Sequence, residues 1–263
     1  MKGYSLHAVN DLRYEELEYP ECATGWCVVK VKAAGICSSD IPRVYTKGTY
    51  HFPTIPGHEF SGVVDKVADK ENETLVGKKV GIFPLIPCRK CQQCKDGHYE
   101  MCSNYDYVGS RRDGGFAEYV AVPVWNLVEL SDEISFEEAA MMEPLAVALH
   151  AIKIANVKNG DTVAIIGTGM IAFAAAQWAK KLGAAEVIVV GRSESKRKIA
   201  ENIPGIGYAT FENCKEEFDV VLEAVGSNSA IDTAINMVKA DRYEGIDGLK
   251  AYAIIGIALM HVL

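Results

Sequence analysis

The chain has 263 residues, of which 49% are hydrophobic and 24% are charged, a composition typical of globular proteins. This length is sufficient for two modest domains with buried cores. The formal net charge of -8 and the pI near 5.3 disfavour nucleic acid and acidic membranes as partners. The amino terminus lacks the apolar run of a signal peptide, and the apolar stretch at 251–263 is too short to span a bilayer. We therefore expect a cytoplasmic protein, in which clustered cysteines hold metal more often than they form disulfides.

The first half of the chain predicts a β-rich domain. Residues 26–33 alternate between apolar and polar side chains with a period of about two, as a half-buried strand does. Similar short runs follow at 60–67, 79–83 and 116–122, separated by glycine, proline and polar residues. Several short strands at such spacing are typical of a small barrel or sandwich.

The pattern changes near residue 135. Ser135 and Glu138 form a capping box that opens an apolar helical stretch through Ile154, which we expect Pro144 to interrupt. Beyond it, strands are expected at 162–166, 187–190 and 219–224, and helices at 170–182, 193–200 and 229–238. This βαβαβ order predicts a doubly wound parallel sheet of the Rossmann kind.

Four cysteines lie within fifteen positions: Cys88, Cys91, Cys94 and Cys102. Four thiolates in one short loop can complete a tetrahedron around zinc, which leaves no open position and makes the site structural. An iron–sulfur ligand run would have a shorter last gap followed by proline, whereas Ser103 follows Cys102 here.

Two further groups of residues could form functional sites. Cys37, His58 and Glu143 could ligate a metal, but their separation in sequence makes each a weak signal alone. By contrast, Gly167 and Gly169 follow a predicted strand and open a predicted helix, which is the context of a dinucleotide fingerprint. Gly167 permits the tight turn, and Gly169 lets the backbone approach a pyrophosphate at the helix amino terminus.

Together these features resemble the zinc-containing alcohol and polyol dehydrogenases of the medium-chain dehydrogenase/reductase superfamily. The resemblance covers residues 1 to about 240 and depends on the segments 35–43, 56–62, 109–119 and 143–147. It implies an α/β fold in which a β-rich GroES-like barrel domain precedes the Rossmann sheet. The implied domains are a catalytic domain at 1–147 with a structural zinc lobe at about 84–108, and a dinucleotide-binding domain at 148–240. The tail at 241–263 is atypical, with 250–258 as a stand-in strand, and the family's carboxyl-terminal part is expected to be missing.

The resemblance also implies roles for individual residues. Cys37, His58 and Glu143 occupy the catalytic zinc-ligand positions, and Glu59 is a nearby carboxylate that replaces a zinc-bound water or ligates transiently. Which of Glu59 and Glu143 is the resting ligand stays open. Asp40 would orient the ligand histidine. Ser39 occupies the family's hydroxyl-relay position, and His58 and Glu59 would join it in catalysis.

The implied activity is transfer of a hydride from a secondary alcohol of a polyol or polyol phosphate, such as sorbitol or galactitol 1-phosphate, to NAD or NADP, giving a ketose. Two zinc ions per chain, one catalytic and one structural, and a homodimer or homotetramer are implied as well. A simple alcohol or threonine-type dehydrogenase of the same fold is an alternative. A second alternative, from another class, is an inactive zinc- and nucleotide-binding fragment.

Two departures from the family pattern bear on specificity. Where a carboxylate usually holds the ribose hydroxyls, this chain has Gly191, Arg192 and Ser193, which would suit a 2′-phosphate and therefore NADP. The cofactor site is expected to include these residues together with four of the glycine turn and helix start: Gly167, Gly169, Met170 and Ile171. Arg111 and Arg112 prompt the hypothesis that one of them binds a substrate phosphate.

Overall fold

The computed structural model describes residues 1–214 and 217–239, which divide into two compact units between Glu143 and Pro144. The sequence placed the domain boundary between 147 and 148. The expected tail at 241–263, including the stand-in strand at 250–258, lies outside the described residues.

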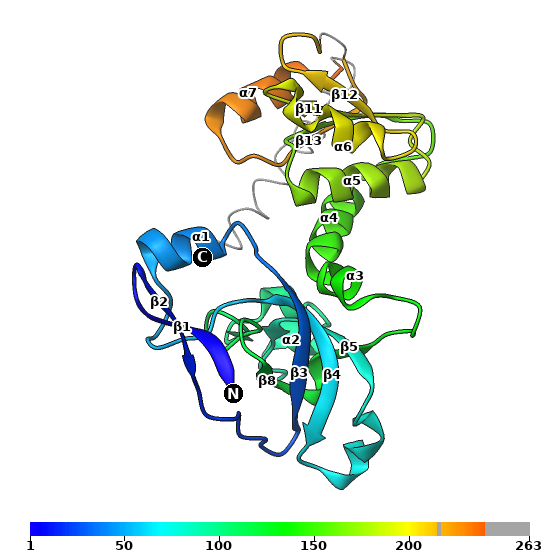
Figure 1. Cartoon of the computed structure of the whole chain (residues 1–263). Coiled ribbons are helices and arrows are strands. Elements are labelled where there is room, and N and C mark those ends of the chain that lie inside the picture. Colours follow the sequence, from blue (N-terminus) through cyan, green and yellow to red (C-terminus); the bar gives the residue numbers. More distant parts are fainter. Residues whose placement is uncertain (215–216, 240–263) are drawn as a thin grey trace. The chain divides into compact units, whose positions relative to one another are not determined.

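A five-stranded antiparallel sheet forms the centre of the first unit (Figure 1). In spatial order its strands are β8 (Tyr119–Pro123), β3 (Trp26–Gly35), β4 (Glu59–Val67), β5 (Lys79–Ile82) and β9 (Leu127–Glu129). Alternate residues of these strands point into one apolar core, which includes Cys27, Val29, Phe60, Val64 and Val80. The predicted β-rich domain is thereby confirmed.

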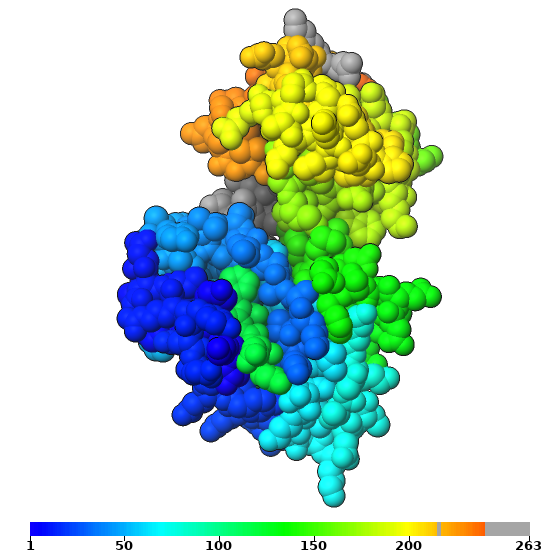
Figure 2. Space-filling view, in the orientation of Figure 1, coloured from blue at the N-terminus to red at the C-terminus, as the bar shows by residue number. Residues whose placement is uncertain are grey.

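Smaller elements complete this unit. A surface hairpin pairs β1 (Lys2–Ala8) with β2 (Asp11–Glu16), in dark blue in Figure 2, and β6 (Leu85–Ile86) pairs with β7 (Asp106–Tyr107). The helical segments are α1 (Asp40–Pro42), a π-helical turn (Arg43–Lys47), α2 (Gln92–Lys95), α3 (Phe136–Ala140) and 3-10 turns at Lys70–Leu75, Tyr99–Met101 and Val124–Asn126. The hairpin was not predicted, because β2 has no buried residue and so lacks the apolar alternation that identifies a strand.

The capping box is present as predicted. The Ser135 hydroxyl accepts a hydrogen bond from the Glu138 N–H at 3.1 Å, and the Glu138 carboxylate accepts one from the Ser135 N–H at 2.7 Å. The helical stretch breaks at Met141, before α4 (Met142–Ile154), and not at Pro144 as expected. Pro144 lies in the first turn of α4, where a missing N–H removes no hydrogen bond within the helix.

The second unit contains a four-stranded parallel sheet in the order β12–β11–β10–β13 (Figure 1). Its strands are β10 (Thr162–Ile166), β11 (Glu186–Gly191), β12 (Gly207–Thr210) and β13 (Val220–Glu223), and its helices are α5 (Met170–Lys181), α6 (Arg197–Glu201) and α7 (Asn228–Asn236). This is the strand order 3-2-1-4 of a Rossmann sheet, as predicted.

Both faces of this sheet are covered. Val163 and Ile165 belong to a core that includes residues of α4 and α5, whereas Ala164 and Ile166 belong to a second core that includes residues of α7. All four side chains are fully buried. Burying a side chain such as Ile165 stabilises the fold by about 1.5–3 kcal/mol, so an uninterrupted apolar strand is favoured here over an alternating one.

Three element predictions need correction. The strand expected at 116–122 begins only at Tyr119, because residues 116–118 pair with the first strand instead, through Tyr4 N–H to Phe116 O and Glu118 N–H to Lys2 O. The helix expected at 193–200 is a 3-10 turn at Glu194–Lys196 followed by α6. The edge strand β12 was missed, since it is short and begins with glycine.

Within residues 1–214 and 217–239, no helix combines the length and apolar character needed to cross a membrane.

The capping box generates a stability prediction. Ser135→Ala should lower the free energy of unfolding by about 1 kcal/mol, because the Glu138 N–H loses its acceptor. Ser131→Ala is the matched control, since Ser131 is exposed four residues earlier in the chain and caps no helix. Urea unfolding followed by circular dichroism measures both variants. Equal losses in the two would contradict the capping role.

Candidate functional site

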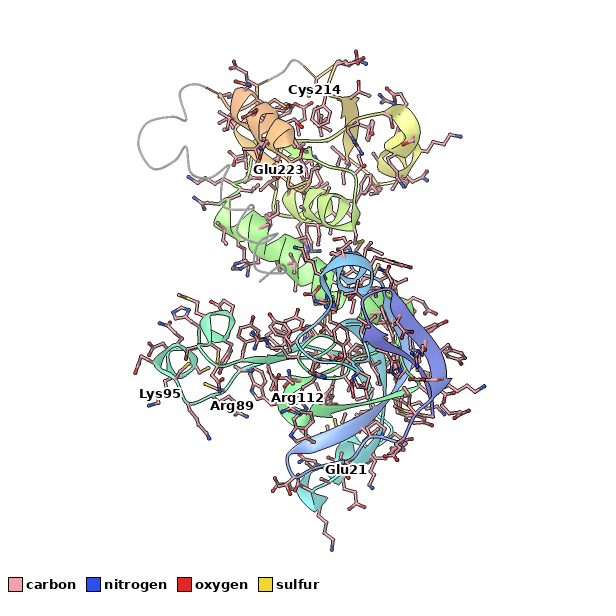
Figure 3. All side chains as sticks on the ribbon, turned by 90° about the vertical axis from the view of Figure 1, so that its left-hand side faces the viewer. Glu21, Arg89, Lys95, Arg112, Cys214 and Glu223 are labelled. Atoms are coloured by element: carbon pink, nitrogen blue, oxygen red, sulfur yellow. The ribbon has the colours of Figure 1, made fainter. Side chains whose placement is uncertain are left out.

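The four clustered cysteines converge in an arm between β6 and β7, which Figure 3 shows extending from the rest of its unit, with Arg89 and Lys95 labelled on it. Cys91 precedes α2, Cys94 lies within it and Cys102 ends a 3-10 turn. The backbone reverses tightly here, with positive φ of 58° at Arg89 and 84° at Gly97. These turns direct the four side chains toward one point.

The geometry of these sulfurs fits zinc. All four Sγ atoms lie within 4.8 Å of one another, and those of Cys88 and Cys94 are 3.9 Å apart. Zn–S bonds of about 2.3 Å in a tetrahedron place the sulfurs roughly 3.8 Å apart. Backbone N–H groups of Cys94 and Ser103 lower the pKa of Cys91 to about 6, which favours the thiolate that a metal needs. Four protein ligands would leave a metal bound here no open position for substrate.

A second group of potential ligands forms where β3 ends and β4 begins. Gly35 pairs with Glu59 across the two strands, so Cys37, which follows β3, comes next to His58 and Glu59. One ligand atom from each of Cys37, His58 and Glu59 lies within 4.8 Å of the others. A Cβ at Gly35 would approach Glu59 Oε2 to 2.6 Å, so glycine at this position leaves room for the carboxylate.

Asp40 connects the parts of this group. Its carboxylate, 2% exposed, accepts hydrogen bonds from the Cys37 N–H at 3.0 Å and from Arg43 at 2.8 Å. Its Oδ1 is also 3.7 Å from His58 Nδ1, in agreement with a role in orienting that ring. Burial raises the pKa of Asp40, which the Arg43 guanidinium opposes.

Glu143 lies near this group without belonging to it. Among the described residues, the ligand atoms within 4.8 Å include a carboxylate oxygen of Glu59 and none of Glu143. The Glu143 carboxylate accepts a long hydrogen bond of 3.4 Å from Tyr107 Oη. Burial and the neighbouring Glu59 raise the pKa of Glu143 to about 7.

Ser39 and Tyr107 also lie at this centre. The Ser39 N–H donates to Cys37 Sγ at 3.5 Å, and Ser39 is partly buried, whereas Ser38 is exposed. The Tyr107 ring contacts His58 edge-on, with 5.8 Å between ring centroids. Sequence reasoning missed Tyr107, because a tyrosine four residues before Arg111 carries no motif of its own.

Close glycine contacts join the ligand segment, at Gly57, to the loop between β7 and β8. A Cβ at Gly109 would lie 2.5 Å from Gly57 O, and one at Gly114 would lie 2.1 Å from the same oxygen. The Gly115 N–H donates to this oxygen at 2.8 Å. The backbone before His58 therefore packs directly on the loop that carries both candidate phosphate-binding arginines.

The two arginines differ in their surroundings. Arg112, labelled in Figure 3, donates from Nε to the Asp106 carboxylate at 2.5 Å and is therefore neutralised. Arg111 instead lies over the rings of Tyr50 and Tyr105.

The second unit holds a pocket of about 580 Å³ at the carboxyl ends of its strands, where ligands bind in sheets of this kind. Of the residues predicted for the cofactor, Gly167, Gly169, Gly191 and Arg192 line it. Gly167 has a φ of 124°, which a side chain would strain, and a Cβ at Gly169 would meet no atom within 4 Å. The glycine turn therefore leaves open space beside the amino terminus of α5.

The other predicted cofactor residues do not line this pocket. Met170 is 43% exposed, Ile171 packs against the sheet core, and the Ser193 carbonyl accepts a hydrogen bond from Tyr208 Oη. Sequence reasoning missed other lining residues, among them Thr168, Phe211, Val225, Ser227 and Thr233. Phe211 directly follows β12, and Val225 lies two residues after the end of β13, so a search of strand ends would have found them.

Comparison with known proteins finds relatives of both units. Residues 23–132 match the alcohol dehydrogenase GroES-like domain, and residues 149–257 match the shikimate/quinate 5-dehydrogenase family. Galactitol 1-phosphate 5-dehydrogenase of Escherichia coli K12 is 40% identical over 174 residues, which cover 66% of this chain and 50% of that protein. A D-xylulose reductase A of Aspergillus clavatus is 30% identical over 258 residues, with coverage of 90% and 72%.

A solved structure supports the same relation. The crystal structure of a zinc-binding dehydrogenase from Sinorhizobium meliloti, bound to NADP, superposes with a TM-score of 0.86 at 30% identity. The match covers 91% of this chain and 74% of that one. The chain spans about half the length of the galactitol 1-phosphate 5-dehydrogenases that it matches.

The cysteine arm generates a metal prediction. Cys91→Ser should remove one zinc ion per chain and leave the ion at Cys37 in place, because the two ligand groups share no residue. Cys22→Ser is the control: Cys22 donates to the Trp26 carbonyl, which a serine hydroxyl can also do. Elemental analysis of the purified variants gives the zinc content. An unchanged zinc content in Cys91→Ser would exclude the arm as a metal site.

Proposed function

Because this chain belongs to the zinc-dependent medium-chain alcohol and polyol dehydrogenase family, we propose that it oxidises a secondary alcohol of a polyol or polyol phosphate to a ketose with NAD or NADP. The observation that carries the proposal is the convergence of Cys37, His58 and Glu59 within 4.8 Å. Three protein ligands leave a position for substrate, as catalytic zinc sites do. The pocket beside Gly167 and Gly169 provides space for the dinucleotide.

Thiolate, imidazole and carboxylate together form a donor set that suits zinc. We propose Glu59, and not Glu143, as the resting ligand, because its carboxylate shares the group with Cys37 and His58. Zinc held there supplies Lewis-acid polarisation of an alcohol oxygen. Asp40 would keep His58 oriented, and Glu143 would lie beside the substrate as a second carboxylate.

The proton of the alcohol needs a route out of this buried centre. Ser39 is the hydroxyl nearest in sequence to Cys37 that is partly buried, and its N–H contacts the Cys37 sulfur. We propose that its Oγ receives this proton and passes it outward. Such a relay matters because oxidation stalls if the alcohol cannot lose its proton while the nicotinamide accepts the hydride.

The cofactor proposal concerns the far end of the dinucleotide. Arg192 lines the pocket and is exposed, and within the described residues no carboxylate lies within ion-pair distance of it. Arg197, one turn further on, is already neutralised by Glu194. An unpaired guanidinium at the end of β11 favours a 2′-phosphate, so we propose that NADP is accepted and preferred.

One assay tests the proposed function. Reduction of NAD and NADP is followed by absorbance with a panel of hexitols, hexitol phosphates, simple alcohols and L-threonine, alongside zinc content. Turnover of polyols or their phosphates with two zinc ions per chain supports the proposal. Turnover confined to simple alcohols or threonine would replace it with the rival dehydrogenase, and one zinc without turnover would indicate a binding fragment. Sedimentation analysis of the same sample tests the homodimer or homotetramer that we also propose.

The relay generates a kinetic prediction. Ser39→Ala should lower kcat by about 100-fold or more, because general acid–base transfer contributes roughly that factor. The pH profile of kcat should change as well, which a purely structural defect would not cause. Ser38→Ala is the control, since Ser38 is exposed. Full turnover with an unaltered profile in Ser39→Ala would remove the relay.

Arg192 generates a specificity prediction. Arg192→Gln should lower kcat/KM for NADP by about 10- to 100-fold, the usual effect of losing a hydrogen bond to a charged group, and should leave kcat/KM for NAD nearly unchanged. Lys198→Gln on exposed α6 is the control, because Lys198 does not line the pocket. A parallel loss with both cofactors would show that Arg192 has no part in choosing between them.

A further inference from the structure

Arg111 is a cation with aromatic neighbours and no anionic partner. Its Cζ lies 4.1 Å from the Tyr50 ring centroid and 4.5 Å from the Tyr105 centroid. Its Nε is buried and, among the described residues, has no hydrogen-bond partner. The residue as a whole is only partly buried, so part of its side chain is open to a ligand. Two aromatic neighbours restrict the orientation of a guanidinium, which reduces the freedom it loses on binding.

The charge of Arg111 is not compensated by a nearby carboxylate. In residues 1–214 and 217–239 no acidic group lies within 4.0 Å of it, whereas Arg43 pairs with Asp40 and Arg112 with Asp106. Asp113, two residues away, accepts the Ile55 N–H at 2.9 Å. A positive charge that is permanent, oriented and unpaired attracts an anion, and the planar guanidinium matches phosphate in particular.

The position of Arg111 relates it to the metal-ligand group of the same unit. Its carbonyl contacts His51 Nε2 at 3.1 Å, and Ser110 O accepts from Thr49 at 2.6 Å, so the segment before β4 holds this loop at both residues. Tyr107, four residues earlier, contacts His58. Gly109 and Gly114, on either side of Arg111, pack on Gly57. The loop is therefore fixed against the backbone that carries the ligand histidine.

We propose that Arg111 binds the phosphate group of a phosphorylated polyol, so that the substrate is a polyol phosphate and not the free polyol. Arg112 takes no part, because Asp106 neutralises it. This inference rests on the proposed function, in that the metal-ligand group acts on the hydroxyl while Arg111 holds the opposite, anionic end. The phosphate meets the terminal nitrogens of the guanidinium, since Nε is enclosed.

A matched pair of variants tests the proposal by kinetics. For the wild type, kcat/KM should be higher with a hexitol 1-phosphate than with the same hexitol. Arg111→Gln should lower kcat/KM for the phosphate ester by about 10- to 100-fold, mainly through KM, as expected for a lost hydrogen bond to a charged group. It should leave the values for the free hexitol unchanged, and Arg111→Lys should recover part of the loss. Arg112→Gln should behave as the wild type.

Other outcomes would overturn the proposal. An equal loss on both substrates would make Arg111 a structural brace between the two tyrosines. Equal kcat/KM of the wild type for both substrates would show that no residue recognises the phosphate. A phosphate-specific loss in Arg112→Gln would assign phosphate binding to Arg112 instead.

A binding measurement separates this inference from the proposed function. Inorganic phosphate is titrated calorimetrically into the Arg192→Gln protein, in which the dinucleotide pocket has lost its own unpaired guanidinium. Binding should be present there, absent when Arg111→Gln is added, and retained when Arg112→Gln is added instead. Retention in the Arg111→Gln combination, or no binding in the Arg192→Gln protein, would overturn the anion site. If phosphate binding is lost on adding Arg111→Gln and the wild type oxidises no polyol, the anion site stands and the proposed function is refuted.

Discussion

The turn after β3 is held by the buried carboxylate of Asp40, and the metal-ligand group depends on that turn. Asp40 accepts the Cys37 N–H and the Arg43 guanidinium, and it lies 3.7 Å from the His58 ring. A carboxylate in this position is costly to bury unless it is paired. Arg43 supplies the charge, and the Cys37 N–H supplies a hydrogen bond that also aims the sulfur. The Asp40 carboxylate is thus paired, which offsets the cost of burying it, and it helps to orient two potential metal ligands, Cys37 and His58.

Two further carboxylates, those of Glu59 and Glu143, lie close to Asp40. Burial raises the pKa values of both Glu59 and Glu143; the charge of Asp40 adds to the rise at Glu59, and the charge of Glu59 adds to the rise at Glu143. A divalent cation would reverse that preference, because it stabilises both carboxylates in the charged form. The arrangement is therefore better suited to a cation-loaded state than to the bare protein. In the cysteine arm the directions are mixed: backbone N–H groups favour the thiolate at Cys91, whereas burial raises the pKa of Cys94.

The sequence predicted those parts of the molecule that short-range patterns specify. Apolar strands at 162–166, the capping box at Ser135 and the glycine turn at Gly167 follow from local backbone preferences, and the structure has all three. The cysteine arm was equally predictable, because its ligands are near neighbours in the chain. The group at Cys37 and His58 was not predictable from spacing, since the pairing of β3 with β4 creates it. Tyr107 and the aromatic neighbours of Arg111 depend on loop packing, which leaves no periodic signal.

The contact among Gly57, Gly109 and Gly114 has a consequence for how such a site could diversify. A side chain at Gly109 or Gly114 would overlap the backbone of Gly57, so the loop packs directly on the segment that carries His58. The two segments therefore keep a fixed spacing. Between the two loop glycines, Ser110 is buried and Asp113 accepts the Ile55 N–H, whereas Arg111 is only partly buried and Arg112 is exposed, so these two side chains can be exchanged without shifting the ligands. Substitutions in the loop could therefore change which substrate it binds while the metal ligands keep their positions, so long as the three glycines are kept.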